Sequence, residues 1–275
     1  MKKLSLLVTG WVLGLFSLVA QADMLVLVHG YLGTAHSWEA SGINSVLEQN
    51  GWQRAGVVHA GPAGIQLVPG PGQQSANKVY TVELPSIAPL TLQAQQLQAM
   101  LRELSARHPG EPLYIAGHSA GGVVARLALV RDPSISANAL VTIASPHLGT
   151  ARAIEALEET DGSGPIGWIK DFFGGDLYHT VKHSWGALVE LTPAHPGNML
   201  FWLNSQKHPD IAYHSIVRTG PVGLGDELVP LFSQDMNNVP ALKGRSKVQA
   251  VSADHSLNPR DGVMLVQVIS AAGKG

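Results

Sequence analysis

The segment that most constrains the fold of this chain is Leu113 to Gly122. It begins with the apolar run Leu-Tyr-Ile-Ala, continues as Gly-His-Ser-Ala-Gly-Gly, and leads into a second apolar stretch, Val123 to Leu129. A short apolar run that ends at a glycine predicts a buried strand, and the stretch after it predicts a helix. Gly117 and Gly121 flank the junction, where any larger side chain would strike the neighbouring backbone. We therefore expect a strand–turn–helix unit with Ser119 at the turn.

A serine on such a turn is placed to react. The sharp turn lifts the Ser119 hydroxyl clear of the sheet edge, and the next backbone N–H, that of Ala120, stands at the amino end of a helix. The helix dipole there favours a developing oxyanion. This pattern is a nucleophile elbow. A serine hydroxyl is a poor nucleophile near neutral pH, so it needs a histidine to take its proton and a carboxylate to orient that histidine.

The partners of Ser119 are sought in the order expected of an elbow, with the acid before the histidine. Of the histidines that follow Ser119, only His255 comes just after the last predicted strand, Lys247 to Val251. The acid should follow the preceding strand, Ile211 to Arg218, and Asp226 is the first choice in the loop there.

Other carboxylates lie close to these positions in the sequence. Glu227 is adjacent to Asp226 but should point elsewhere, Asp235 lies further along, and Asp254 neighbours His255, which usually aims a side chain away. A solvated loop aspartate is the competing interpretation of Asp226. A second oxyanion donor is expected from the loop after the first strand, His29 to Gly33, so the two donors would be the N–H groups of Tyr31 and Ala120.

Apolar runs such as Met24 to Val28 and Ala139 to Ile143 alternate with helical patterns. Uninterrupted apolar runs suit strands covered on both faces, so the sequence predicts an α/β fold with a mainly parallel central sheet flanked by helices. Residues 61–75 are rich in Gly, Pro and Gln and predict a loop. Further strands are expected at 55–58 and 79–83, and helices at 37–49, 90–107 and 263–271.

Residues 1–22 differ in kind from the rest. Two lysines precede an apolar run to Ala20, and Ala20-Gln21-Ala22 is a small-x-small cleavage site, which predicts a secretory signal peptide. A retained amino-terminal membrane anchor is the alternative. Residues 23–275 then form one domain, exported to the periplasm or secreted. The chain has no cysteine, so neither a disulfide nor a thiol nucleophile enters any hypothesis.

The segment at about 150–206 interrupts the alternation of strands and helices. Val181, Trp185 and Leu188 share one face at helical spacing. One interpretation is ordinary core beneath a long insertion, and the other is a helical lid whose apolar underside covers an acyl-binding cleft. The chain carries a formal charge of −2 with only 14% charged residues. This balance gives no electrostatic reason to expect a nucleic-acid partner or an anionic membrane surface.

Taken together, five segments make the chain resemble the α/β-hydrolase superfamily, and within it the secreted bacterial lipases and esterases and the inositol-deacylase-like hydrolases. In order, these segments are VLVHGYLG (26–33), GHSAGG (117–122), ASPHLGT (144–150), DELVP (226–230) and DHS (254–256). The resemblance implies that Ser119 is the nucleophile, Asp226 the acid and His255 the base, with Tyr31 and Ala120 as oxyanion donors. It also implies a lid between strands six and seven.

The resemblance leaves some of the family's features without a counterpart. Secreted lipases of the family often carry a disulfide and a calcium ion, but no disulfide can form here and no calcium ligands can be identified. His147 could face the cleft, but it is assigned no role.

The activity expected from these residues is that of a serine carboxylic-ester hydrolase acting on lipid or other apolar acyl esters, without a cofactor. Its partners would be the ester substrate and a lipid interface. The same triad would also serve a thioesterase, an acyltransferase or an amidase, because specificity lies in the pocket. A catalytically silent protein of the same fold that binds a lipid or a partner is the remaining hypothesis.

Overall fold

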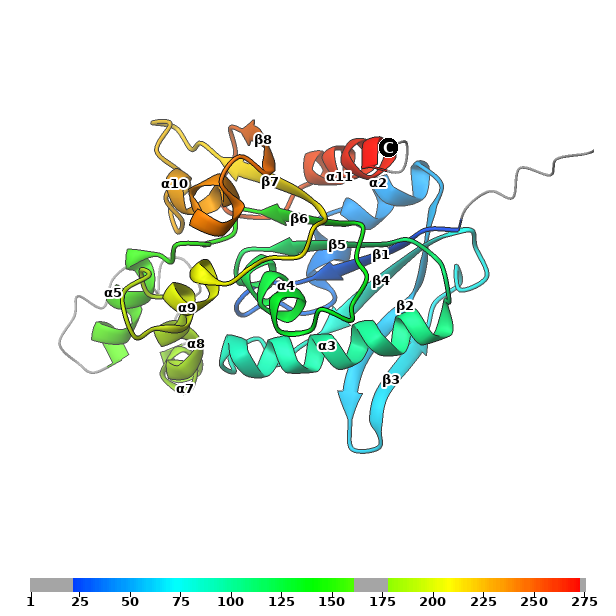
Figure 1. Cartoon of the computed structure of the whole chain (residues 1–275), viewed down its shortest axis with the longest axis horizontal. Coiled ribbons are helices and arrows are strands. Elements are labelled where there is room, and N and C mark those ends of the chain that lie inside the picture. Colours follow the sequence, from blue (N-terminus) through cyan, green and yellow to red (C-terminus); the bar gives the residue numbers. More distant parts are fainter. Residues whose placement is uncertain (1–21, 161–177, 273–275) are drawn as a thin grey trace, which may run out of the picture.

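A computed structural model describes residues 22–160 and 178–272 of the chain. The strands of this part form one eight-stranded sheet in the order β3-β2-β4-β1-β5-β6-β7-β8 (Figure 1). All neighbouring pairs are parallel except β2 and β3. The strands are β1 (Met24–Val28), β2 (Trp52–Gly61), β3 (Gly64–Pro69), β4 (Asn77–Glu83), β5 (Leu113–His118), β6 (Ala139–Ile143), β7 (Ala212–Arg218) and β8 (Ser246–Val251).

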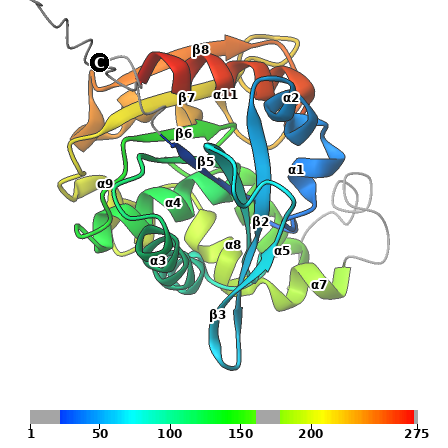
Figure 2. The same cartoon turned by 90° about the vertical axis from the view of Figure 1, so that its right-hand side faces the viewer.

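Helices cover both faces of the sheet (Figures 1 and 2). On one face α3 (Leu90–Arg107) packs beside α4 (Ala120–Arg131), and on the other α2 (Ile43–Gln49) packs beside α11 (Pro259–Ala272). Every side chain of β1 is fully buried, and successive residues belong to the two different hydrophobic cores on either side of the sheet. This two-sided burial explains why the strand is continuously apolar rather than alternating.

Two expectations about local structure were wrong. The Gly- and Pro-rich stretch 61–75, predicted to be a loop, contains β3, which pairs antiparallel with β2 at the sheet edge. The side chains of β3 are half-buried or exposed, so the strand lacks the apolar run by which buried strands are found. The helix expected over 37–49 is two helices, α1 (Ser37–Ala40) and α2, because the chain turns at Gly42 with a φ of 78°.

The chain between β6 and β7 carries four described helices, which are α5 (Ala151–Thr160), α7 (Tyr178–His183), α8 (Trp185–Leu191) and α9 (Met199–Ser205). Val181 and Leu188 are buried as expected, but Trp185 is 60% exposed. Ser184 separates α7 from α8 with non-helical dihedral angles, so one helical spacing does not run through both. The middle of the predicted lid, 161–177, lies outside the described residues.

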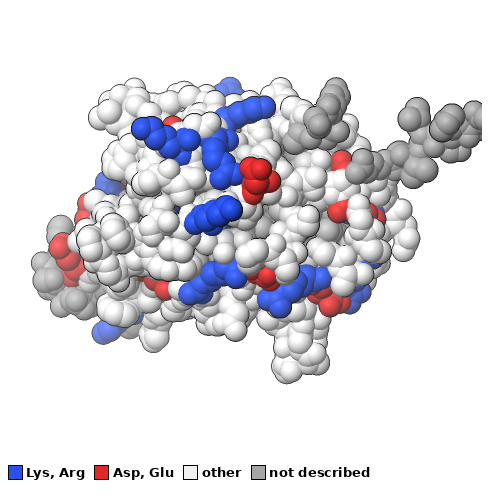
Figure 3. Space-filling view, viewed as in Figure 1, with Lys and Arg blue, Asp and Glu red and all other residues white. Residues whose placement is uncertain are grey.

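The predicted signal segment also falls almost wholly outside the described residues, which begin at 22. In the part of the chain that the structure describes, no helix combines the length and apolar character needed to cross a bilayer. The face drawn in Figure 3 is mostly uncharged, as the low content of charged residues leads one to expect.

Candidate active site

Ser119 lies on the turn between β5 and α4, with φ 52° and ψ −130°, a backbone conformation that L-residues rarely adopt. The flanking glycines make this turn sterically feasible. A Cβ added at Gly117 would lie 2.5 Å from the Cα of Gly122, and one at Gly121 would lie 2.3 Å from the carbonyl oxygen of His29. The predicted strand–turn–helix unit is therefore present, with Ser119 at its apex.

The three residues expected to act together lie in hydrogen-bonding distance of one another. The Oγ of Ser119 is 2.8 Å from Nε2 of His255, and Nδ1 of the same ring is 3.0 Å from Oδ2 of Asp226. His255 follows β8 and Asp226 follows β7, so the carboxyl ends of three parallel strands bring Ser119 together with two residues more than one hundred positions further along the sequence. The arrangement can pass a proton from the hydroxyl to the imidazole while the carboxylate holds the ring.

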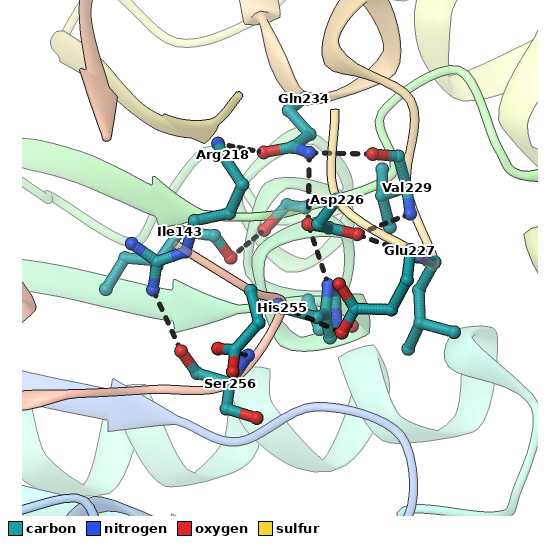
Figure 4. A network of polar contacts seen from close by, with 12 residues as sticks. Ile143, Arg218, Asp226, Glu227, Val229, Gln234, His255 and Ser256 are labelled. Atoms are coloured by element: carbon teal, nitrogen blue, oxygen red, sulfur yellow. Dashed lines mark hydrogen bonds and ion pairs between the residues drawn. The ribbon is translucent and has the colours of Figure 1, made fainter. Parts of the chain in front are cut away.

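Hydrogen bonds hold Asp226 in place (Figure 4), and its side chain is fully buried. Its Oδ1 accepts hydrogen bonds from the backbone N–H groups of Leu228 and Val229, and its Oδ2 accepts from His255 and from Nε2 of Gln234. Burial alone would raise the pKa of Asp226, but the His255 imidazole and the two backbone N–H groups together lower it. Because the carboxylate can only accept, Nδ1 of His255 carries its proton and Nε2 is left to accept from Ser119.

The carboxylates set aside in the sequence have other partners. Glu227 does not touch the imidazole, but its Oε1 accepts a hydrogen bond from the backbone N–H of His255 at 3.2 Å. Oδ1 of Asp254 accepts from the N–H of Ser256, and Oδ1 of Asp235 accepts from the N–H of Asn237. Sequence reasoning missed the contacts that Gln234 and Glu227 make, since neither residue type nor spacing signals them.

The loop after β1 lies directly against Ser119. A Cβ added at Gly30 would come within 2.8 Å of the Cβ of Ser119 and 3.0 Å of the carbonyl oxygen of His118, so the backbone passes this point closely enough to require glycine. Tyr31 is the next residue in the chain. On the other side, Ala120 is the first residue of α4, where a backbone N–H has no carbonyl one turn back within the helix. Tyr31 and Ala120 thus flank Ser119 from the two elements expected to supply oxyanion donors.

The sequence profile of the Alpha/beta hydrolase family matches residues 25–264. The chain belongs to this family. No curated protein matches the sequence significantly.

Solved structures similar to this α/β hydrolase share its fold at low sequence identity. They include the mature lipase BlEst2 of Bacillus licheniformis, at 16% identity with a TM-score of 0.62, covering 92% of this chain and 93% of that one. The lin2722 gene product of Listeria innocua has 15% identity and a TM-score of 0.57, covering 92% and 91%. The RedJ thioesterase of Streptomyces coelicolor has 16% identity and a TM-score of 0.53, covering 92% and 86%.

Two further histidines of this hydrolase are His118, which precedes Ser119 directly, and His147, which follows β6. Nε2 of His118 donates to the carbonyl oxygen of His255 at 2.9 Å, and burial together with the neighbouring His255 lowers the pKa of His118 to about 3. His118 is therefore neutral near pH 7. His147, expected to be able to face the cleft, is instead fully buried, with its Nε2 3.1 Å from Oγ1 of Thr142 and its backbone N–H donating to the carbonyl oxygen of Ser233.

A buried ion pair supports the loop that carries His255. Both guanidinium nitrogens Nη1 and Nη2 of Arg218 lie 2.7 Å from the carboxylate oxygens of Asp261, and neither side chain is exposed. Nη2 also donates to the carbonyl oxygen of Ser256 at 3.1 Å, the contact drawn in Figure 4. The sequence offered no signal for this pair, because its members are more than forty residues apart and belong to no motif.

An apolar hollow opens beside Ser119 in the hydrolase, with a volume of about 60 Å³. The helices of the β6–β7 insertion supply much of its wall. Its apolar lining residues are Pro146, Ala153, Ala156, Val181, Leu188, Leu191, Leu228 and Val229. Among the described residues, no group of three His, Asp or Glu side chains is arranged to hold a metal ion.

Proposed function

We propose that this α/β hydrolase is a serine carboxylic-ester hydrolase that works through an acyl-enzyme. The observation that carries the proposal is the continuous chain of hydrogen bonds from Ser119 through His255 to Asp226. The tautomer imposed on His255 by the buried carboxylate is the one a general base requires. The elbow and the close approach of the β1 loop to Ser119 support the same role.

In the proposed mechanism, Oγ of Ser119 attacks the ester carbonyl carbon while Nε2 of His255 takes the hydroxyl proton. The N–H groups of Tyr31 and Ala120 would stabilise the oxyanion of the tetrahedral intermediate. The carbon–oxygen bond to the alcohol then breaks, and His255 returns its proton to the departing alkoxide. A water molecule, activated by His255, attacks the acyl-enzyme and releases the carboxylic acid. No step uses a cofactor.

The apolar hollow beside Ser119 is where we place the acyl group of the ester. Its wall is mostly aliphatic, with Thr150 and Arg152 also present, which suits a hydrocarbon chain, but about 60 Å³ is well below the several hundred Å³ of clefts that bind larger ligands. We therefore expect a short acyl chain to fit best within the broader class of apolar acyl esters. Contact with a lipid interface remains a prediction from the sequence.

A thioesterase is the second candidate function. One of the similar structures is a thioesterase, and a thioester carbonyl would meet the same serine, histidine and oxyanion donors. Acyl transfer and amide hydrolysis use the same groups as well, and the departing group separates these activities. A silent lipid-binding protein would have no need of the strained Ser119 backbone.

The deciding experiment is hydrolysis of p-nitrophenyl esters of increasing acyl length, beside acyl-thioester substrates, with the Ser119→Ala variant as control. We expect turnover to fall by several orders of magnitude in the variant, and butyrate to be preferred to palmitate. Equal rates for the two proteins would exclude the proposal. Faster turnover of thioesters than of esters with the same acyl group would favour the thioesterase.

We also propose that residues 1–22 direct export, with periplasmic or secreted protein as the product. The small-x-small site before Asp23 supports cleavage there. Mass spectrometry of the protein isolated from a secreting host should give an amino terminus at Asp23. A retained full-length chain in the membrane fraction would support the anchor instead.

A further inference from the structure

Two hollows lie on either side of Tyr31, which lines both of them, and Ser119 lines the first. The first is the small apolar hollow. The second is a groove of about 690 Å³, a volume typical of clefts that bind a small molecule. It runs past Gly30, His118 and the two residues that follow His255. The proposed reaction assigns the two hollows different parts of the ester.

The groove lies on the side of the departing alcohol. His255 must give its proton to the alkoxide, so the alcohol leaves where the histidine and its flanking residues stand. Ser256 and Leu257 line the groove, and the ring of His118 in its wall lies 5.1 Å from the ring of His255, measured between centroids. None of these residues lines the small apolar hollow.

The wall of the groove is rich in hydroxyl groups. Besides the hydroxyl of Tyr31, which is hydrogen-bonded to Ser184, they belong to Ser37, Ser41, Ser86, Thr180 and Ser256. Ser41 is fully engaged, since its Oγ donates to the carbonyl of Trp38 and accepts from the N–H of Ile43. Within the described residues, no hydrogen bond is made by the hydroxyls of Ser86, Thr180 and Ser256, and Oγ of Ser37 accepts from Thr34 with its own proton left to donate. Four hydroxyls can therefore serve a ligand.

The described part of the groove wall carries no charge that would select an ionic group. No Lys, Arg, Asp or Glu is among the described residues that line it. Among the described lining residues His118 alone has a titratable imidazole, and burial keeps that ring neutral at ordinary pH. A phosphate or carboxylate on the alcohol would thus lose water without gaining a partner cation. A neutral alcohol with hydroxyl groups of its own would exchange hydrogen bonds to water for hydrogen bonds to the wall.

We infer that the substrate is the ester of a short acyl group with a neutral, polyhydroxylated alcohol, held by the unpaired hydroxyls of Ser86, Thr180 and Ser256. This inference rests on the proposed ester hydrolysis and adds the chemical class of the leaving group. Glycerol and a hexose share the required chemistry. The alcohol's free hydroxyls lie in the groove while the acyl chain enters the apolar hollow on the other side of Ser119.

The test holds the acyl group constant and varies the alcohol. The measured quantity is kcat/KM for n-propyl butyrate, 1-butyrylglycerol, 6-O-butyrylglucose and 1-butyrylglycerol 3-phosphate. Propanol and glycerol have the same carbon skeleton, so their comparison isolates the hydroxyl groups. We expect at least one polyol ester to exceed the propyl ester by about tenfold or more, and the larger ratio identifies the alcohol. The phosphate ester should be the poorer of the two glyceryl substrates.

Amino-acid substitutions test whether the hydroxyl groups of the groove cause the preference for polyol esters. In the double variant Ser86→Ala/Thr180→Val we expect the polyol-to-propyl ratio to fall at least threefold. Because the ratio is internal to each preparation, loss of folded enzyme does not change it. Ser105→Ala in α3, at a site that does not line the groove, is the matched control and should keep the ratio.

Equal rates on propyl and polyol esters, a preference for the phosphate ester, or an unchanged ratio in the double variant would overturn the inference. Each of these results would leave the esterase proposal intact, provided that p-nitrophenyl butyrate is still hydrolysed in a Ser119-dependent way. Absence of that hydrolysis would overturn the esterase proposal itself.

Discussion

Nε2 of His118 donates a hydrogen bond to the backbone carbonyl of His255 across 2.9 Å, so the residue before Ser119 holds the residue proposed to act as its general base. A carbonyl oxygen can only accept, so the proton of neutral His118 must be on Nε2. This contact fixes the backbone of the His255 loop, while Asp226 fixes the imidazole ring. Two separate contacts, one to the backbone and one to the ring, therefore set the position of His255.

Replacing His118 should weaken catalysis without removing a charge. We expect His118→Ala to lower kcat by about tenfold or more, because small displacements of a general base are costly, with a lesser effect on KM. His118→Gln retains an N–H donor and should recover part of the loss. Steady-state kinetics on p-nitrophenyl butyrate would show this, and equal losses in the two variants would argue against positioning through the hydrogen bond.

Gly30 permits the close approach of the β1 loop to the nucleophile. A methyl group there would lie 2.8 Å from Cβ of Ser119, so the loop that carries the Tyr31 N–H must move. We expect Gly30→Ala to reduce kcat by about 10²-fold, the usual effect of losing one oxyanion donor. Gly64→Ala at the tip of the β2–β3 hairpin is the control, since a Cβ there meets nothing within 4 Å. It should lower the melting temperature and preserve kcat. Unchanged kcat in Gly30→Ala would contradict the role of this loop.

The buried pair of Arg218 and Asp261 should show strongly non-additive energetics. Arg218→Met leaves the Asp261 carboxylate buried without its cation, for which we expect about 3–5 kcal/mol of lost stability in urea unfolding. The double variant Arg218→Met/Asp261→Leu removes both charges and should recover much of that loss. We expect both variants to have a reduced kcat, since in each of them the carbonyl oxygen of Ser256 lacks the hydrogen bond from Arg218. A double variant as unstable as the single one would contradict this account.

Sequence reasoning found the central strands and the elbow because their signals are local. Buried parallel strands such as β1 have unbroken apolar sequences, and the turn at Ser119 requires glycine two residues before and two residues after the serine. The order of strands then pointed to loops holding Asp226 and His255, and the structure brings these residues together with Ser119. Their catalytic roles rest on the proposal above.

What sequence reasoning missed depends on contacts between distant segments. Nothing near Arg218 in the chain indicates that Asp261 will neutralise it, and nothing near Gln234 indicates a contact with Asp226. The edge strand β3 was missed for a different reason. Its exposed side chains carry no burial pattern, so its glycines and prolines dominated the prediction. The hydroxyls of the groove likewise come from segments far apart in sequence.

Acid should destabilise the protein partly through buried histidines. His208 is 2% exposed, its Nδ1 donates to the carbonyl of Gln206, and burial with the nearby charges of Arg126 and Arg245 lowers its pKa to about 4. An unfolded histidine titrates near pH 6.5. Between these values the unfolded chain binds a proton that the native protein does not, so the free energy of unfolding falls as the pH falls from about 6.5 to about 4.

We expect His208→Gln to flatten this dependence, by at most about 3 kcal/mol over the interval. The measurement is urea unfolding of both proteins at several pH values from 7 to 4. A residual slope of the same sign should persist, because burial also lowers the pKa of His118 and His147. His195→Gln, at an exposed position in the β6–β7 insertion, is the matched control. If the His208→Gln protein lost stability with acid as steeply as the unmodified one, His208 would not be a buried neutral histidine, and the slope would have to arise elsewhere.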